Sequence, residues 1–509
     1  MGRGFSSKVR RDRRDRALGA GVIAAASASL LACGALVSPD TVEAQARQLQ
    51  AVIATPPKIR TNIRPYVRLE ESFTDNAALS AGSRRSDFIT RALAGLSAQV
   101  NRGRLMAALR AEYAYDRYAR NRDLSGGTTY ANGSGSYNVL RDRLWIDADG
   151  TIAQMYASSF PISGSDRAGT QGRTRLAIYR VGPRLTARLG QFADLIAAVR
   201  SQWVSYGVED SGPIAQLPPD TNILQALARI DTGDRFGGYQ LLTSASVVRD
   251  DHDYHAASVV QSAYLRVTPK LRMVGRAGYE QVRERGVIDL DAPVLSAGVE
   301  FRPNAASRLT LEGGRRYDRM AWNAKADVRV GKAVTLTGEY YETLSPSQVY
   351  VANSFERFVE QTRDLPAPVV PQNFTLRENL YNQTSYNKAA ELHAIYSGER
   401  QSLDLSARWS RRKFVGPETK DETLYGSALY TRRIRPDVEV GVDANYSRTF
   451  DSPVYGEFEA YGVSGRVLYR LNSSTDFNAS YHHTRGAQLT GGRAQTRENL
   501  FRVSLEKRF

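Results

Sequence analysis

The chain has 509 residues, a formal net charge of +16 and a mean hydropathy of −0.42. Beyond the first forty residues, no apolar run reaches the length of about 20 residues that a membrane-spanning helix needs, which excludes a helical membrane protein. The basic residues are spread singly, without a zinc-ligand or helix-turn-helix pattern, and this argues against a nucleic-acid partner. A transmembrane β-barrel hides its apolar face in alternation and would show this same hydropathy.

The amino-terminus has the organisation of an export signal. Basic residues occupy positions 3–16, an uncharged Ala-rich segment covers 17–37, and Ala44-Gln45-Ala46 places small residues at the cleavage spacing. We therefore expect residues 1–46 to be a signal peptide and 47–63 a short periplasmic segment. The only cysteine, Cys33, follows Leu30-Leu31-Ala32 as in a lipoprotein box. The prediction is that it leaves with the signal peptide; acylation of Cys33 and a retained signal anchor are the alternatives.

Residues 64–509 are predicted to form the barrel. Segments 104–116, 402–412, 437–447 and 476–484 alternate apolar and polar side chains over about ten residues, the length of a tilted membrane strand. The last nine residues repeat the pattern and end in an aromatic residue, as in a barrel insertion signal. Its apolar side is formed by Phe501, Val503, Leu505 and Phe509.

The predicted fold is an all-β, antiparallel up-and-down transmembrane barrel of about 22 strands. The region 147–235 leaves 18–20 strands as alternatives, because Pro183 interrupts one candidate strand and 147–150 resembles a hairpin turn. Short turns alternate with mostly longer connections, and outer-membrane barrels place short turns in the periplasm. Both termini are therefore expected in the periplasm. The short turns are at 101–103, 268–270, 303–304, 331–332, 398–399, 435–437 and 472–474, and the longer connections are 74–86, 119–136, 283–292, 345–382, 414–421, 450–456 and 486–496.

The insert at 345–382 is too apolar for a freely solvated loop, and a barrel of this size has a wide lumen to cover. We expect it to fold inward or to cover the mouth as a constriction; an ordered external loop is the alternative. The constriction candidates are Phe355, Arg357, Phe358 and Arg363.

Charged residues fall on the predicted inner side of the strands. The pore-lining candidates are Arg110, Glu112, Arg408, Arg412, Glu439, Asp443 and Arg502. Arginine binds carboxylate or phosphate groups in a forked geometry, which favours anionic solutes. The alternative is that these charges pair with one another and only make the lumen polar.

No catalytic pattern is present. The sequence lacks a nucleophile elbow and a P-loop, so we expect neither an enzyme nor a cofactor. The segment Asp250-Asp251-His252-Asp253-Tyr254-His255 has side chains that can bind a cation. It lies at a predicted hairpin tip, where such residues are more often solvated, and no metal site is predicted.

Four segments resemble a known barrel group: 64–76, 86–90, 353–358 and 497–509. They are similar to the PEP-CTERM/exopolysaccharide-associated outer-membrane β-barrel proteins, related to the β-barrel porin 2 family. Lys507 departs from the pattern, since related terminal strands have an apolar residue there. The resemblance implies an outer-membrane protein of a Gram-negative bacterium, encoded with polysaccharide-export systems.

The expected function is an outer-membrane channel linked to export of an exopolysaccharide or another anionic solute. A general diffusion porin with mild anion preference, and a structural or adhesive barrel with a plugged lumen, are the alternatives. Expected partners are outer-membrane lipid and lipopolysaccharide, the barrel-assembly machinery and periplasmic polysaccharide-export components, but no nucleic acid.

Overall fold

The computed structural model describes residues 60–156, 167–168, 173–208, 219–233, 235–346, 349, 384–416, 419–452, 456–489 and 495–509. The predicted signal peptide, the cleavage site, Cys33 and the four constriction candidates lie outside these residues. Within them there are 22 strands and one short 3-10 helix, Arg122–Leu124. The strands are β1 (Arg60–Thr74), β2 (Asp87–Arg102), β3 (Leu105–Tyr118), β4 (Gly126–Leu140), β5 (Leu144–Tyr156), β6 (Arg173–Leu189), β7 (Ala193–Val208), β8 (Thr221–Asp231), β9 (Tyr239–Asp250), β10 (Tyr254–Arg266), β11 (Leu271–Glu284), β12 (Ile288–Asn304), β13 (Ser307–Arg316), β14 (Arg319–Val330), β15 (Val334–Pro346), β16 (Thr384–Ser397), β17 (Gln401–Phe414), β18 (Lys420–Arg435), β19 (Val438–Asp451), β20 (Phe458–Asn472), β21 (Thr475–Gln488) and β22 (Gln495–Arg508).

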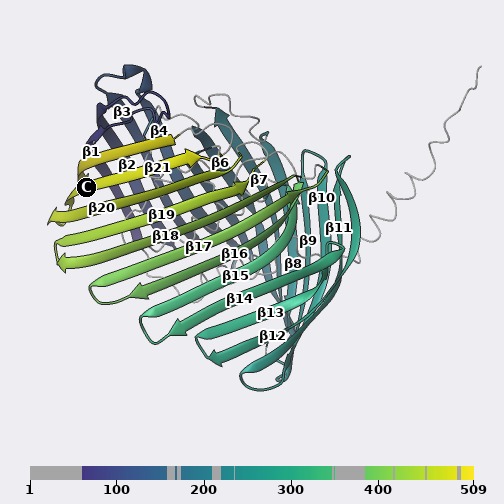
Figure 1. Ribbon diagram of the computed structural model, residues 1–509. Helices are drawn as coiled ribbons and strands as arrows, with labels where there is room; N and C mark the ends of the chain where they lie inside the picture. Colours follow the sequence, from purple (N-terminus) through teal and green to yellow (C-terminus); the bar gives the residue numbers. More distant parts are fainter. Residues whose placement is uncertain are drawn as a thin grey trace, which may run out of the picture.

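Each strand pairs antiparallel with its neighbours in the chain, and the sheet closes on itself. β1 pairs with β22 from Tyr66 opposite Arg508 to Thr74 opposite Leu500. The purple and yellow ends of the sheet accordingly lie side by side in Figure 1. Closure leaves no exposed sheet edge, which a spanning β-structure requires. The predicted all-β, 22-strand up-and-down barrel is confirmed.

The region that sequence patterns left ambiguous forms regular strands. Residues 147–150 are not a hairpin turn, because they lie inside β5 and pair with β6. Pro183 lies within β6 opposite Ile146, and the pairing of β6 with β7 omits Gly182 and Pro183. A proline has no N–H to donate to a neighbouring strand. β6 therefore continues through Pro183, but its pairing with β7 is interrupted there.

Two predicted loops are shorter than expected. Most of 119–136 belongs to β4, and β12 starts at Ile288 inside the predicted loop 283–292. The sequence of β4, GGTTYANGSGSYNVL, contains few large apolar residues, so its alternation could not be read as a strand.

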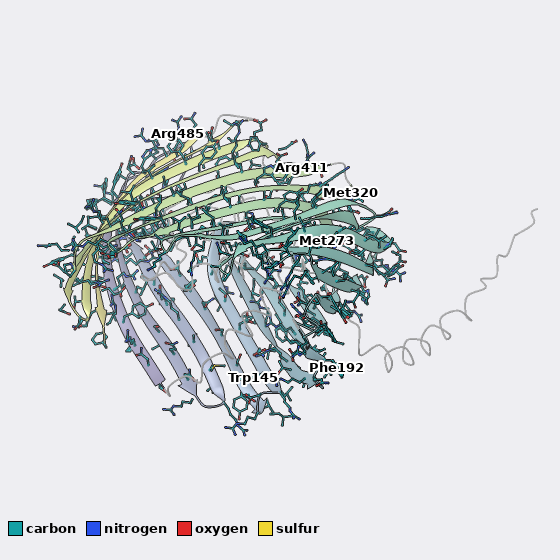
Figure 2. The ribbon with its side chains drawn as sticks, turned by 90° about the horizontal axis from the view of Figure 1, so that it is seen from below. Trp145, Phe192, Met273, Met320, Arg411 and Arg485 are labelled. Carbon is teal, nitrogen blue, oxygen red and sulfur yellow. The ribbon has the colours of Figure 1, made fainter. Side chains whose placement is uncertain are left out.

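The two surfaces of the wall differ in chemistry. Large apolar side chains such as Phe73, Tyr113 and Leu295 are exposed on the outside, while the alternate positions place buried polar residues such as Glu70 and Glu112 inside. Figure 2 shows Met320 on the outer side of the wall. The described residues include no helix that is long and apolar enough to cross a membrane.

Candidate functional site

The seven pore-lining candidates all lie on the inner side of the wall, at alternate positions to the exposed apolar residues. They are spread over four strands: Arg110 and Glu112 on β3, Arg408 and Arg412 on β17, Glu439 and Asp443 on β19, and Arg502 on β22. The structure therefore distributes them around the lumen and does not gather them into one site.

Each of the seven has a polar or oppositely charged partner. Arg110 pairs with Glu112, Arg408 with Glu391 at 2.5 Å, Arg412 with Asp421, Glu439 with Arg466 at 3.9 Å, Asp443 with Ser464, and Arg502 with Glu70 at 2.9 Å. Two of these pairs, Arg412 with Asp421 and Arg502 with Glu70, are almost fully buried, so solvent screens them weakly. The inner face thus presents compensated charge at these positions.

The seam between β1 and β22 contains three polar bridges in succession. Arg68 pairs with Glu506 at 2.6 Å, Glu70 with Arg502 at 2.9 Å, and the Thr74 hydroxyl donates to Glu498 at 2.5 Å. These bridges connect the first strand to the last at positions 68, 70 and 74 of β1, all of which face inward.

A second group of charges covers the inner face of β11 to β13. Arg276 pairs with Glu312 at 2.7 Å and Arg316 with Glu280 at 3.3 Å. Fully buried Glu300 has Arg272, Arg302 and Arg308 within 4 Å. The sequence analysis missed this group, although Arg272, Arg276 and Glu280 recur at inward positions four residues apart on β11.

Two residues of the connection between β5 and β6, Arg167 and Ala168, lie inside the barrel, which the sequence did not predict. Arg167 is 1% exposed and pairs with Glu498 at 2.5 Å. The backbone N–H of Ala168 donates to Asp116 at 2.6 Å, and the Tyr118 hydroxyl donates to the Ala168 carbonyl at 2.8 Å. These partners are inward-facing residues of β22 and β3, so Arg167 and Ala168 lie against the inner wall at the end opposite the short turns.

An apolar cluster lines the inner face at the same end of the barrel. It includes Leu176 and Tyr206, Tyr254 and Tyr317, and Val349 of the insert between β15 and β16. Burial raises the pKa of Tyr317, in the β13–β14 turn, to about 12. Because Val349 packs with inward-facing residues, the insert turns towards the lumen at this point.

The acidic and histidine-rich hairpin tip is organised as a turn. One oxygen of Asp250 accepts the backbone N–H groups of His252, at 2.8 Å, and Tyr254, at 2.9 Å. His252 contacts Asp251 at 2.8 Å. Among the described residues, no group of three or more potential metal ligands is present.

Comparison with known proteins shows similarity of fold only. No protein-family model and no curated protein matches the chain. Similar solved structures include the ferric-catecholate import receptor Fiu from E. coli K12, with 10% identity and a TM-score of 0.49 over 89% of this chain and 82% of that one. The siderophore receptor PirA from Acinetobacter baumannii has 8% identity and a TM-score of 0.47 over 89% and 81%. OccAB4 from the same organism has 8% identity and a TM-score of 0.35 over 89% and 100%.

The class of protein follows from the chain's own geometry. A closed antiparallel wall with an apolar exterior and a charged interior is stable only where lipid surrounds it and water fills or borders the inside. The chain is therefore a β-barrel of the Gram-negative outer membrane.

Proposed function

We propose that this barrel is an outer-membrane channel, narrowed at the end opposite the short turns, where Arg167, Ala168 and Val349 lie against the inner face. The observation that supports it most directly is the Arg167–Glu498 pair, which holds a loop residue against the inner wall. A lumen lined by paired charges stays polar, and polar solutes can pass along it without a large desolvation penalty.

The finer part of the proposal concerns the solute. Export of an exopolysaccharide or another anionic solute, with periplasmic export components as partners, follows from the family resemblance. The pairing of the inner charges favours only a mild anion preference, which also fits a general diffusion porin. The basic net charge of the chain supports anionic over cationic cargo.

Single-channel recording of the purified barrel in planar bilayers tests the proposal. We expect discrete conductance steps, with Arg167→Ala increasing the conductance or the frequency of transitions because Glu498 loses the cation that holds the loop. Arg497→Ala is the matched control, since Arg497 is a neighbouring but exposed residue of β22. A barrel without conductance steps, in the wild type and in Arg167→Ala alike, would contradict the channel and favour a plugged barrel.

A further inference from the structure

The two ends of the barrel differ in exposed charge. We call the end formed by the ten turns that follow the even-numbered strands from β2 to β20, together with the β1–β22 seam, the short-turn rim. Nine of these ten turns have at least one exposed Lys or Arg in the turn or the adjoining strand end, for example Arg104, Arg141, Lys270 and Lys332. The exception, the β12–β13 turn, lies between half-buried Arg302 and Arg308.

Exposed carboxylates are scarce on this rim. Among its described residues, Asp142 and Glu399 are exposed acids, and the side chains of Asp194 and Asp437 are 47% and 39% exposed beside Arg235 and Arg435. At the opposite end, exposed cations alternate with exposed acids, including Asp251, Asp289 and Asp318. The short-turn rim is therefore a cationic ring, whereas the other end has mixed charge.

Large apolar side chains are exposed next to these cations. Leu140 is 56% exposed beside Arg141, Val330 is 55% exposed beside Arg329, and Leu471 is 50% exposed beside Arg470. Phe192 lies at the same end, in the β6–β7 turn (Figure 2). A soluble acidic partner would explain the cations of the rim but not the exposed apolar side chains beside them. At a lipid surface, the apolar side chain enters the hydrocarbon boundary and the neighbouring cation stays at the level of the headgroups.

We infer that the short-turn rim binds the phosphate groups of anionic phospholipids in the membrane leaflet that surrounds it. Guanidinium groups bind phosphate in a forked geometry, and lysines contribute point charges. Because the cations are spread around the ring, each turn offers a separate headgroup contact, and the contacts add through electrostatic attraction to the charged surface.

Lipid binding to the full-length protein tests this inference. Phosphatidylglycerol or phosphatidylcholine is titrated into the barrel in an uncharged detergent, and bound lipid is counted by native mass spectrometry. The rim variant is R104Q/R141Q/K270Q/K332Q. The matched control is R84Q/R122Q/K413Q/R497Q, which removes four exposed cations from the opposite end. Heat-modifiable migration on gels confirms that each variant is folded.

We expect the wild type to prefer phosphatidylglycerol and the rim variant to bind it at least tenfold more weakly, since each interfacial cation contributes about fivefold. The control should change by less than about twofold. Equal binding of the two lipids by the wild type, or equal losses in both variants, would overturn the inference. Displacement of bound phosphatidylglycerol by an equal concentration of inorganic phosphate would also overturn it, because the exposed apolar side chains would then contribute nothing to binding.

Discussion

Glu300 is a carboxylate of the inner wall with three arginine neighbours. It is fully buried, and Arg302 and Arg308 approach it at 2.7 and 2.5 Å while Arg272 lies at 3.9 Å. A single anion that holds three guanidinium groups together prevents their mutual repulsion in a partly desolvated position.

Glu300→Gln should therefore destabilise the barrel by about 1–2 kcal/mol, because the substitution leaves three partly buried cations without their counter-charge. Urea unfolding of the barrel in lipid vesicles, followed by tryptophan fluorescence, measures the change. Glu399→Gln is the control, since Glu399 is exposed on the rim and its loss should leave the unfolding midpoint unchanged. Equal midpoints for the wild type and Glu300→Gln would show that the arginines are solvated by other means.

At the scale of the elements, aromatic rings cover glycines on neighbouring strands. A Cβ at Gly313 of β13 would lie 2.6 Å from the ring of Trp322 on β14, and one at Gly127 of β4 would lie 2.4 Å from the Tyr113 hydroxyl on β3. The missing side chains allow the rings to lie flat along the outer wall, an arrangement that fixes the register of paired strands.

Gly313→Ala is expected to displace the Trp322 ring and to cost about 1–3 kcal/mol by overpacking. The change should appear in the fluorescence spectrum of Trp322 as well as in the urea midpoint. Gly275→Ala provides the comparison, because a Cβ there meets nothing within 4 Å. If both alanines have the same effect, backbone preference rather than ring packing explains it.

At the scale of the whole molecule, charge is paired within the lumen and unbalanced on the rim. We expect the open channel to be weakly anion-selective in a potassium chloride gradient. The preference should disappear near 1 M salt, where the Debye length is about 3 Å. The reversal potential measures this directly, and fragments of an anionic polysaccharide added to one chamber should interrupt the current. Cation selectivity at low salt would contradict the expectation.

The sequence predicted the strands of this barrel better than the side-chain contacts inside its lumen. Alternation and the spacing of turns predicted about 22 strands, with 18–20 left open by the region 147–235, and the inward placement of residues such as Arg412 and Arg502, because both depend on a period of two residues along the chain. Alternation does not indicate which charged residues of neighbouring strands pair with each other. The pairing of Arg412 with Asp421 could be identified only from the register of β17 and β18 in the structure. The position of Arg167 could not be predicted, since its partner, Glu498, is 331 residues away and Arg167 itself lies outside any alternating segment.

The seam between β1 and β22 has a consequence for folding. Its bridges join residues more than 400 positions apart, so the chain must close its longest loop to form them, and closure cannot precede synthesis of the last strand. A slip of one residue at this seam would turn the inward charges of one strand, either Arg68 and Glu70 of β1 or Arg502 of β22, towards the hydrocarbon, where isolated charges are strongly disfavoured. The three polar bridges therefore favour the correct register of β1 against β22, because a barrel closed in another register would leave charges in lipid.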